Sequence, residues 1–170
     1  MSCAFMLSGW ARAMGTEFDA GMAALELEYP RASAIGPYFR YYATLLADGY
    51  AKGGRASDAL PILRQAIDTI TEPGVGFYIS ELYRLQGICL LRTDPSKQDE
   101  AMNSLRTAVD VARTQRATLL ELRAATSLAR ASIEIGLPAE GLEPLRDLCA
   151  ALPAEFDATS LVEAQQLLSR

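Results

Sequence analysis

Apolar residues recur along the chain with helical spacing, and the clearest case is the stretch from Leu46 to Ala66. Two amphipathic segments meet there at Gly53-Gly54, and the second has apolar residues at 59, 60, 62, 63, 66, 67 and 70. This i, i+3, i+4, i+7 stripe predicts a helix with one buried face, and glycine is a typical helix end. The stretch therefore predicts a helical hairpin.

Similar segments fill the rest of the chain. The pattern predicts helices over about 2–14, 17–29, 38–53, 56–70, 77–92, 97–114, 117–135 and 138–151, and a last one from near Ser160, where Ser160 and Glu163 have capping-box spacing. Proline and glycine separate them, at Pro30 with the run at 32–37, at 71–76, at 94–96, at Gly136 and at Leu152-Pro153. No segment has the period-two alternation of a strand, so the predicted fold class is all-α.

Small residues recur at matching positions in these segments. The first helix of each pair carries Gly9, Ala47, Gly87 or Ala129, and the second carries Gly21, Ala59, Ala101 or Gly141. Four residues after the second set comes Leu25, Leu63, Leu105 or Leu145. Helices that approach closely need Gly or Ala where they cross. The spacing predicts one domain, 1–170, with stacked repeats over about 2–31, 38–71, 77–114 and 117–151 and a capping helix over about 158–170.

These residues resemble the tetratricopeptide repeat (TPR). The family's small residues match Ala47, Ala59 and Ala66, its large apolar residue matches Leu63, and Tyr50 and Gly54 match as well. The repeat length differs from that of the family. Equivalent small residues of successive repeats are 38 to 42 residues apart, whereas a TPR unit has about 34 residues. The resemblance implies a right-handed α-α superhelix of four TPR-like helical hairpins plus a C-terminal capping helix.

A narrower resemblance concerns the segments 81–87, 120–130 and 156–164. They look like the C-terminal helical-repeat region of bacterial multidomain signalling proteins. In those proteins a class III adenylate/guanylate cyclase domain or a winged-helix DNA-binding domain precedes a STAND-type ATPase module and then such repeats. The resemblance implies a cytoplasmic regulatory or sensor segment, and it leaves open which catalytic domain, if any, lies upstream in the parent protein.

Composition narrows the chemistry. The 16 basic and 21 acidic residues give a net charge of −5, which argues against nucleic-acid binding, and no apolar run approaches the roughly 20 residues of a membrane-spanning helix. The chain has no histidine, the commonest general base and metal ligand. Cys3, Cys89 and Cys149 are far apart and are expected as buried free thiols. We therefore expect no enzyme activity, no cofactor, no metal and no nucleic-acid or membrane partner.

The TPR resemblance implies that the first helix of each pair lines a concave face. It places on that face the predicted partner-binding residues Trp10, Tyr41, Thr44, Asp48, Glu81, Arg84, Arg123, Thr126 and Arg130, with Met6, Ala13, Lys52, Ile88, Arg92 and Glu134 beside them. Arginine and aromatic residues in a groove suit recognition of a peptide or an acidic group. The alternative is a set of salt bridges between neighbouring helices, such as Glu81 with Arg84 or Arg123.

The expected function is a non-catalytic protein- or peptide-binding scaffold that forms the regulatory region of a larger signalling protein. Its partner would be a protein, a peptide or another domain of the same parent chain. The alternative is a freestanding adaptor or self-associating module, in which Phe5, Met6 and Trp10 supply a homodimer surface.

Overall fold

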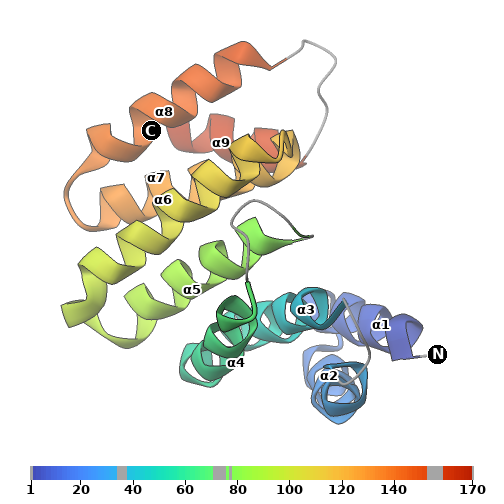
Figure 1. The fold of residues 1–170 in the computed structure, drawn as a ribbon. Coiled ribbons are helices and arrows are strands. Elements are labelled where there is room, and N and C mark those ends of the chain that lie inside the picture. Colours follow the sequence, from blue (N-terminus) through green and yellow to red (C-terminus); the bar gives the residue numbers. More distant parts are fainter. Residues whose placement is uncertain (1, 34–37, 71–75, 77, 153–158, 170) are drawn as a thin grey trace.

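The structure of the chain is a computed structural model that describes residues 2–33, 38–70, 76, 78–152 and 159–169. In these ranges the chain forms nine α-helices and no strand (Figure 1), so the all-α class is confirmed. The helices are α1 (Ser2–Met14), α2 (Phe18–Ser33), α3 (Phe39–Lys52), α4 (Ala56–Asp68), α5 (Ile79–Thr93), α6 (Gln98–Thr114), α7 (Thr118–Glu134), α8 (Pro138–Ala151) and α9 (Thr159–Leu168). None of them is long and apolar enough to cross a bilayer.

The helices lie in two layers. Each odd-numbered helix from α1 to α7 packs against the even-numbered helix that follows it, and it also packs against the next odd-numbered helix. Within the described ranges no two even-numbered helices pack closely against each other, although the Arg106 guanidinium on α6 forms an ion pair with the Glu140 carboxylate on α8. The odd-numbered helices therefore form a continuous inner layer, and α2, α4, α6 and α8 cover it from outside (Figure 1). Stacking of this kind buries two faces of each hairpin, which one hairpin cannot do alone.

Glycine allows the two helices of a pair to touch backbone to backbone. A Cβ added at Gly21 would lie 2.6 Å from the Gly9 carbonyl oxygen, and one at Gly141 would lie 2.5 Å from the Cα of Ala129. At Gly87 the added carbon would lie 2.8 Å from the carbonyl oxygen of a residue on α6. Such distances leave no room for a side chain, so the predicted crossings of the first, third and fourth pairs are confirmed.

Leucine fills the space beside each crossing. The four leucines of the predicted column are all fully buried, with 0% exposure: Leu25, Leu63, Leu105 and Leu145. Burying a leucine side chain contributes about 1.5–3 kcal/mol, so this column is a main source of stability. The core forms two clusters on either side of α5, because Leu82 and Leu85 belong to the N-terminal cluster while Ile88 and Leu91 pack against the C-terminal one.

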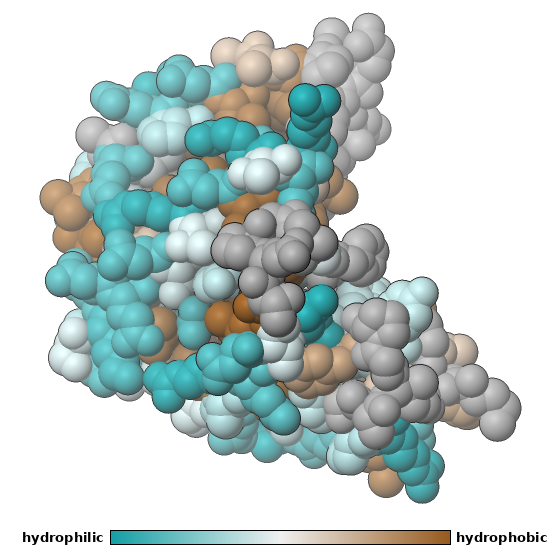
Figure 2. Space-filling model, in the orientation of Figure 1, coloured by the Kyte–Doolittle hydropathy of each residue, from teal (hydrophilic) through white to brown (hydrophobic). Residues whose placement is uncertain are grey.

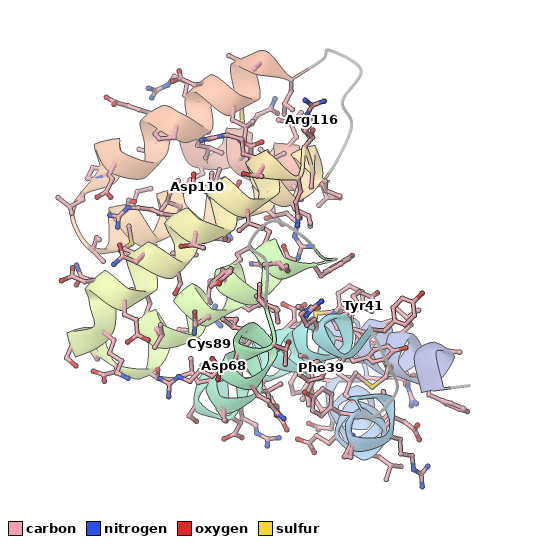
Figure 3. All side chains as sticks on the ribbon, viewed as in Figure 1. Phe39, Tyr41, Asp68, Cys89, Asp110 and Arg116 are labelled. Carbon is pink, nitrogen blue, oxygen red and sulfur yellow. The ribbon has the colours of Figure 1, made fainter. Side chains whose placement is uncertain are left out.

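The turns after α3, α6 and α7 share one geometry. Gly54 and Gly136 adopt the left-handed region at φ 74° and 80°, and the N–H of Arg55 donates to the Tyr50 carbonyl at 2.8 Å. This is the Schellman arrangement that ends helices. After α6 the same position is occupied by Arg116, at φ 53° (Figure 3), where a side chain is less favourable than glycine. The predicted glycine ends of α3 and α7 are confirmed.

Pro30 does not end α2 as predicted. The helix runs through Pro30 to Ser33. Proline removes one i→i−4 hydrogen bond but has a helical φ, and only the last turn lies beyond it. Ala32 in that turn is fully buried, so packing holds the chain in helical form where the local signal favours a break. The run at 34–37, like residues 71–75 and Pro153, lies outside the described residues.

The capping box at the last helix is also a wrong prediction. Helix α9 begins at Thr159, so Ser160 lies inside its first turn and not at the cap. Glu163, the expected partner in the box, faces α7 and forms an ion pair with Arg130 at 3.6 Å. The side chain therefore serves a contact between helices that no local pattern encodes.

Candidate functional site

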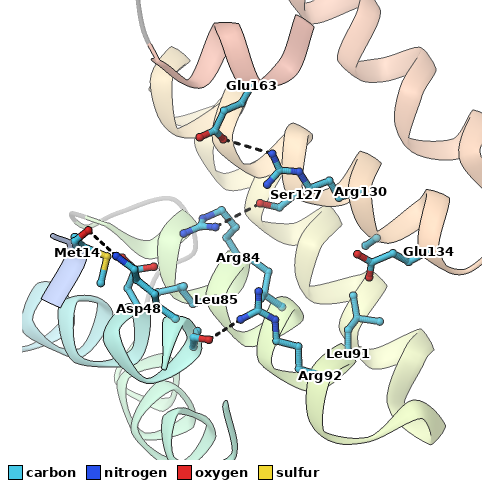
Figure 4. Close-up of a pocket in the computed structure, with 14 residues that line it drawn as sticks. Met14, Asp48, Arg84, Leu85, Leu91, Arg92, Ser127, Arg130, Glu134 and Glu163 are labelled. Atoms are coloured by element: carbon cyan, nitrogen blue, oxygen red, sulfur yellow. Dashed lines mark hydrogen bonds and ion pairs between the residues drawn. The ribbon is translucent and has the colours of Figure 1, made fainter. Parts of the chain in front are cut away.

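A groove of about 590 Å³ opens along the inner layer, where α3, α5, α7 and α9 come together (Figure 4). This volume is typical of a ligand site. Its lining combines apolar side chains with charged groups of both signs. It is lined by Met14, Asp48, Ala51, Lys52, Arg84, Leu85, Ile88, Leu91, Arg92, Ser127, Arg130, Ala131, Glu134 and Glu163.

Three of the nine residues predicted for partner binding line this groove, namely Asp48, Arg84 and Arg130. Four of the neighbours predicted beside them line it too: Lys52, Ile88, Arg92 and Glu134. These residues share a face because side chains three, four and seven apart on a helix point the same way. The groove residues can therefore be found in the sequence from the small residue at each helix crossing, because they follow it on the same inner helix at helical spacing.

At the N-terminal end, α1 and α3 are joined by two polar contacts. Trp10 donates its indole N–H to Asp48 Oδ2 at 3.0 Å, and Lys52 Nζ donates to the Met14 carbonyl at 2.5 Å. Trp10 is half-buried and supports Asp48 from behind the groove without lining it. The contact fixes the orientation of the Asp48 carboxylate.

Glu81 on α5 forms ion pairs with two arginines. Arg84 Nη2 lies 2.9 Å from Glu81 Oε2, and Arg84 Nε lies 3.1 Å from each oxygen. Arg123 on α7 approaches the same carboxylate at 3.3 Å. Glu81 is only 3% exposed, so these charges interact in a medium of low dielectric constant. This network is the salt-bridge alternative that the sequence left open, and it ties α5 to α7.

Arg84 belongs both to this network and to the groove. Burial of Arg84 works against its charge, but the Glu81 carboxylate beside it holds the pKa of Arg84 above its ordinary value. Its Nη1 also donates to Ser127 Oγ at 3.4 Å across the groove. Neither Glu81 nor Arg123 lines the groove, so two of the predicted binding residues act through Arg84 instead.

The remaining predicted residues lie away from the groove. Thr44 and Thr126 are each 4% exposed, and their hydroxyls donate to the carbonyls of Tyr41 and Leu122 within their own helices. The Tyr41 ring packs edge-on against the Tyr78 ring, with 4.7 Å between ring centroids. The TPR resemblance implies that all three lie on the concave face, but none of them lines the groove.

Lys52 and Arg92 link the ends of α3 and α5 to the preceding inner helix. Besides Lys52, Arg92 on α5 reaches back to α3, where its Nη1 donates to the Ala51 carbonyl at 2.6 Å. Cations are favourable at helix C-termini, because the last carbonyl groups carry partial negative charge. At the C-terminal end of the groove the contact is different, because Arg130 pairs with Glu163 and both side chains are about half exposed.

A second cavity of about 470 Å³ continues the groove between α7, α8 and α9. It shares Arg130, Glu134 and Glu163 with the groove, and its other lining residues are mainly apolar: Ile133, Pro138, Leu142, Gln166 and Leu167. Figure 2 shows a largely hydrophilic surface with a hydrophobic patch at the nearby α7–α8 turn, where Ile133 and Leu137 are exposed. Sequence reasoning missed this cavity, because its walls depend on how α9 packs.

The cysteines differ in environment. Burial raises the pKa of the Cys89 thiol to about 11, and it raises the pKa of Cys149 as well. Cys89 is fully buried, as predicted, while Cys149 is only half-buried. Both thiols are free. The side chain of Cys3 lies outside the described residues. In the part of the chain that the structure describes, no three Cys, Asp or Glu side chains come together as a metal site would require.

The comparisons with known proteins give one informative similarity. No family model matches the chain, and no solved structure matches it. The chain is 33% identical over 137 residues to an uncharacterized protein of Rhizobium meliloti (strain 1021), and the match covers 77% of this chain. The chain spans only 13% of the length of that relative. A segment similar to this one therefore occurs within a much longer bacterial protein.

Proposed function

We propose that this chain is a right-handed superhelix of four TPR-like hairpins capped by α9, and that it binds a protein or peptide without catalysing a reaction. The observation that carries this proposal is the groove itself. The inner helices α1, α3, α5 and α7 contribute Met14, Lys52, Arg92 and Glu134 from one matching repeat position, and these residues line a single groove of about 590 Å³. Repeat architectures use such concave surfaces for recognition.

The lining of the groove suits a peptide. Leu85, Ile88 and Leu91 offer apolar contact, while charged groups of both signs stand on the walls at intervals set by the stacking of the helices. An extended peptide presents side chains and backbone groups in series, so it can match such a row of contacts. The chain has no histidine, and the groove holds no paired nucleophile and base of the kind that covalent catalysis needs.

We further propose that the chain is a regulatory region of a larger cytoplasmic signalling protein, linked to a cyclase or a transcription regulator. The similarity to a segment of a much longer bacterial protein supports membership of a long polypeptide. The half-exposed pair Arg130–Glu163 suggests how binding is transmitted. A ligand that draws Arg130 away from Glu163 loosens the contact between α7 and α9, and so changes how the repeats stack.

To test binding in the groove, peptides are first selected from a random library for binding to the immobilised chain. We expect Arg130→Glu to weaken binding of the selected peptides at least tenfold, because the substitution reverses a charge on the groove wall. Arg146→Glu is the matched control, since Arg146 is exposed on α8 and lines neither cavity. Circular dichroism should show the same helix content for both variants. Selected peptides that bind all three proteins equally would refute the groove as the binding site.

Arg84 is unsuitable for this test, although the sequence pointed to it equally. A glutamate at position 84 would lie beside the buried Glu81 carboxylate and leave two like charges in the interior. Such a change destabilises the fold whatever the groove does. Loss of binding in Arg84→Glu would therefore not separate recognition from folding.

Self-association is the second candidate function. Phe5 and Leu27 are exposed on the first pair of helices, at 56% and 67%. Of the three residues predicted for a dimer surface, Met6 is fully buried and Trp10 is hydrogen-bonded to Asp48, so Phe5 is the one that is largely exposed. Sedimentation equilibrium tests this candidate: a wild-type dimer that Phe5→Ser converts to a monomer would support it, and a wild-type monomer at about 100 µM, well above the Kd of a stable dimer, would end it.

A further inference from the structure

At one position of the repeat, the charge of the side chain changes from positive to negative at the C-terminal end of the inner layer. Five residues after the small residue of each crossing, the inner helices carry Met14, Lys52, Arg92 and Glu134. Lys52 donates to the Met14 carbonyl and Arg92 to the Ala51 carbonyl. In these two repeats the position therefore supplies a cation to the end of the preceding inner helix.

Glu134 occupies the same position with the opposite charge. It is the last residue of α7, whose final turn contains no basic residue, whereas α3 and α5 carry Lys52 and Arg92 in their final turns. Across the groove it faces Leu91 near the C-terminal end of α5 (Figure 4). Its carboxylate therefore lies at the C-terminus of its own helix and on the same groove as the last turn of α5, and partial negative charge at these helix ends is unfavourable for it. Within the described ranges no side chain forms an ion pair or hydrogen bond with Glu134.

The adjoining cavity is apolar behind this carboxylate. Ile133, Leu142 and Leu167 form its walls, and Glu134 and Glu163 stand at its mouth with Arg130. Two carboxylates and one guanidinium leave that mouth with one excess negative charge. An apolar cavity with a negative mouth is complementary to a group that combines a large apolar part with a cation.

We propose that this cavity between α7, α8 and α9 binds a peptide segment in which a lysine or arginine adjoins a large apolar residue. The apolar side chain enters the cavity between Leu142 and Leu167. The cation takes the place beside Glu134 that corresponds to the place of Lys52 and Arg92 in the preceding repeats, and it also reaches the C-terminal carbonyls of α5. This inference rests on the proposed function in taking the ligand to be a peptide, and it assigns that ligand its chemistry.

An acidic ligand is disfavoured at this end of the groove for the same reasons. It would meet Glu134, Glu163 and two helix C-termini, against the single guanidinium of Arg130, which Glu163 already engages. A neutral apolar ligand would leave the carboxylate of Glu134 without a counter-ion. Only a cationic ligand relieves the repulsion that the sequence places there.

The test compares two pentapeptides by NMR titration of the isotope-labelled chain. The basic probe is acetyl-Gly-Leu-Lys-Leu-Gly-amide, and the acidic probe has Glu in place of Lys. We expect the basic probe to saturate, with shifts concentrated in the amides of α7 to α9, and the acidic probe to bind at least tenfold more weakly. Glu134→Gln should weaken the basic probe at least fivefold. Glu143→Gln, on an exposed residue that lines neither cavity, should leave it unchanged.

Thermal unfolding without ligand gives an independent readout. Glu134→Arg restores the cation of the preceding repeats, so we expect Tm to rise by about 2–4 °C while binding of the basic probe is lost. A purely structural role for Glu134 predicts a fall in Tm instead. Equal binding of the two probes, no saturable shift with the basic probe, or a lower Tm for Glu134→Arg would overturn the proposal.

The outcome also separates this proposal from the broader one. If Arg130→Glu weakens binding of the library-selected peptides while Glu134→Gln leaves binding of the basic probe unchanged, this inference is wrong and the groove remains the binding site. A basic probe whose binding depends on Glu134, together with selected peptides whose binding does not depend on Arg130, would support this inference and remove the groove as the site of the selected peptides.

Discussion

The inner layer is held together differently in its two halves. Between α1 and α3, and between α3 and α5, a lysine or arginine reaches the backbone carbonyls of the preceding helix. Between α5 and α7 the contact is a buried carboxylate with two arginines, and between α7 and α9 it is the exposed pair Arg130–Glu163. The same architecture therefore uses cation–carbonyl contacts in its N-terminal half and ion pairs in its C-terminal half.

This difference gives the groove two electrostatic ends. A carbonyl carries only a partial negative charge, so it neutralises little of the positive charge of Lys52 or Arg92. The Asp48 carboxylate balances one of these two positive charges. At the other end Glu134 and Glu163 outnumber Arg130. The groove is therefore positive near α3 and negative near α9, and a peptide with an acidic and a basic residue would bind in one direction. Four predictions test this comparison, and the expected effects decrease from the first to the last.

The largest effect is expected at the α5–α7 junction. Glu81→Gln removes the carboxylate from two arginines, of which Arg84 is buried, and breaking a buried pair costs about 3–5 kcal/mol. Asp48→Asn at the α1–α3 junction should cost about 1 kcal/mol, because the indole N–H keeps a neutral acceptor. Urea unfolding of both variants measures the difference.

The double variant Glu81→Leu/Arg84→Met is the control for that prediction. Replacing both charges by apolar side chains removes the burial cost of each, so it should recover most of the lost stability. Equal losses for Glu81→Gln and Asp48→Asn would show that the two junctions do not differ in the way the geometry indicates.

The next effect concerns the helix crossings, which the two halves share. Ala59 is fully buried on α4, and the repeat pattern predicts that α4 crosses α3 there, so Ala59→Leu should overpack the interface and cost about 1–3 kcal/mol. Ser57→Leu is the control, because Ser57 is exposed on the same helix. A neutral Ala59→Leu would mean that the crossing lies elsewhere on α4, and the common register of the two halves would fail.

Removing the cations of the N-terminal half comes third. Lys52→Met and Arg92→Met keep the aliphatic stem but lose a charge-assisted hydrogen bond to a helix C-terminus, so each should cost about 1 kcal/mol. Denaturant unfolding at low ionic strength measures the loss. Wild-type stability in both variants would show that these contacts do not hold the junctions, and would weaken the contrast with the C-terminal half.

The sequence predicted the helices and their crossings because both signals are local. Helical periodicity places Leu25, Leu63, Leu105 and Leu145 on a buried face, and small residues must stand where backbones meet. The groove was predicted less completely. Asp48, Arg84 and Arg130 line it, but Thr44 and Thr126 share their face and are buried. Whether a helix face is exposed to solvent depends on how much of it the neighbouring helix covers, and hydrophobic periodicity does not predict this.

Residues outside the repeat pattern were missed for a related reason. Glu163 lies on the last helix, and its position against Arg130 depends on how α9 packs on α7. The second cavity exists only because of that packing. Pro30 shows the converse, since a strong local break signal yields to the burial of the turn that follows it.

The smallest effect is expected at the α7–α9 junction. Arg130 and Glu163 are separated by 3.6 Å, and their side chains are 53% and 51% exposed. An ion pair so exposed is screened by water and salt, so Arg130→Met should change the free energy of unfolding by less than about 0.5 kcal/mol. Urea unfolding in low salt and in about 1 M NaCl, where the Debye length falls to about 3 Å, measures it, with Lys52→Met as the comparison. A loss as large as that of Lys52→Met would show that α9 is locked onto α7. A smaller loss would mean that breaking the Arg130–Glu163 pair costs little stability, as the proposed regulation through this junction requires.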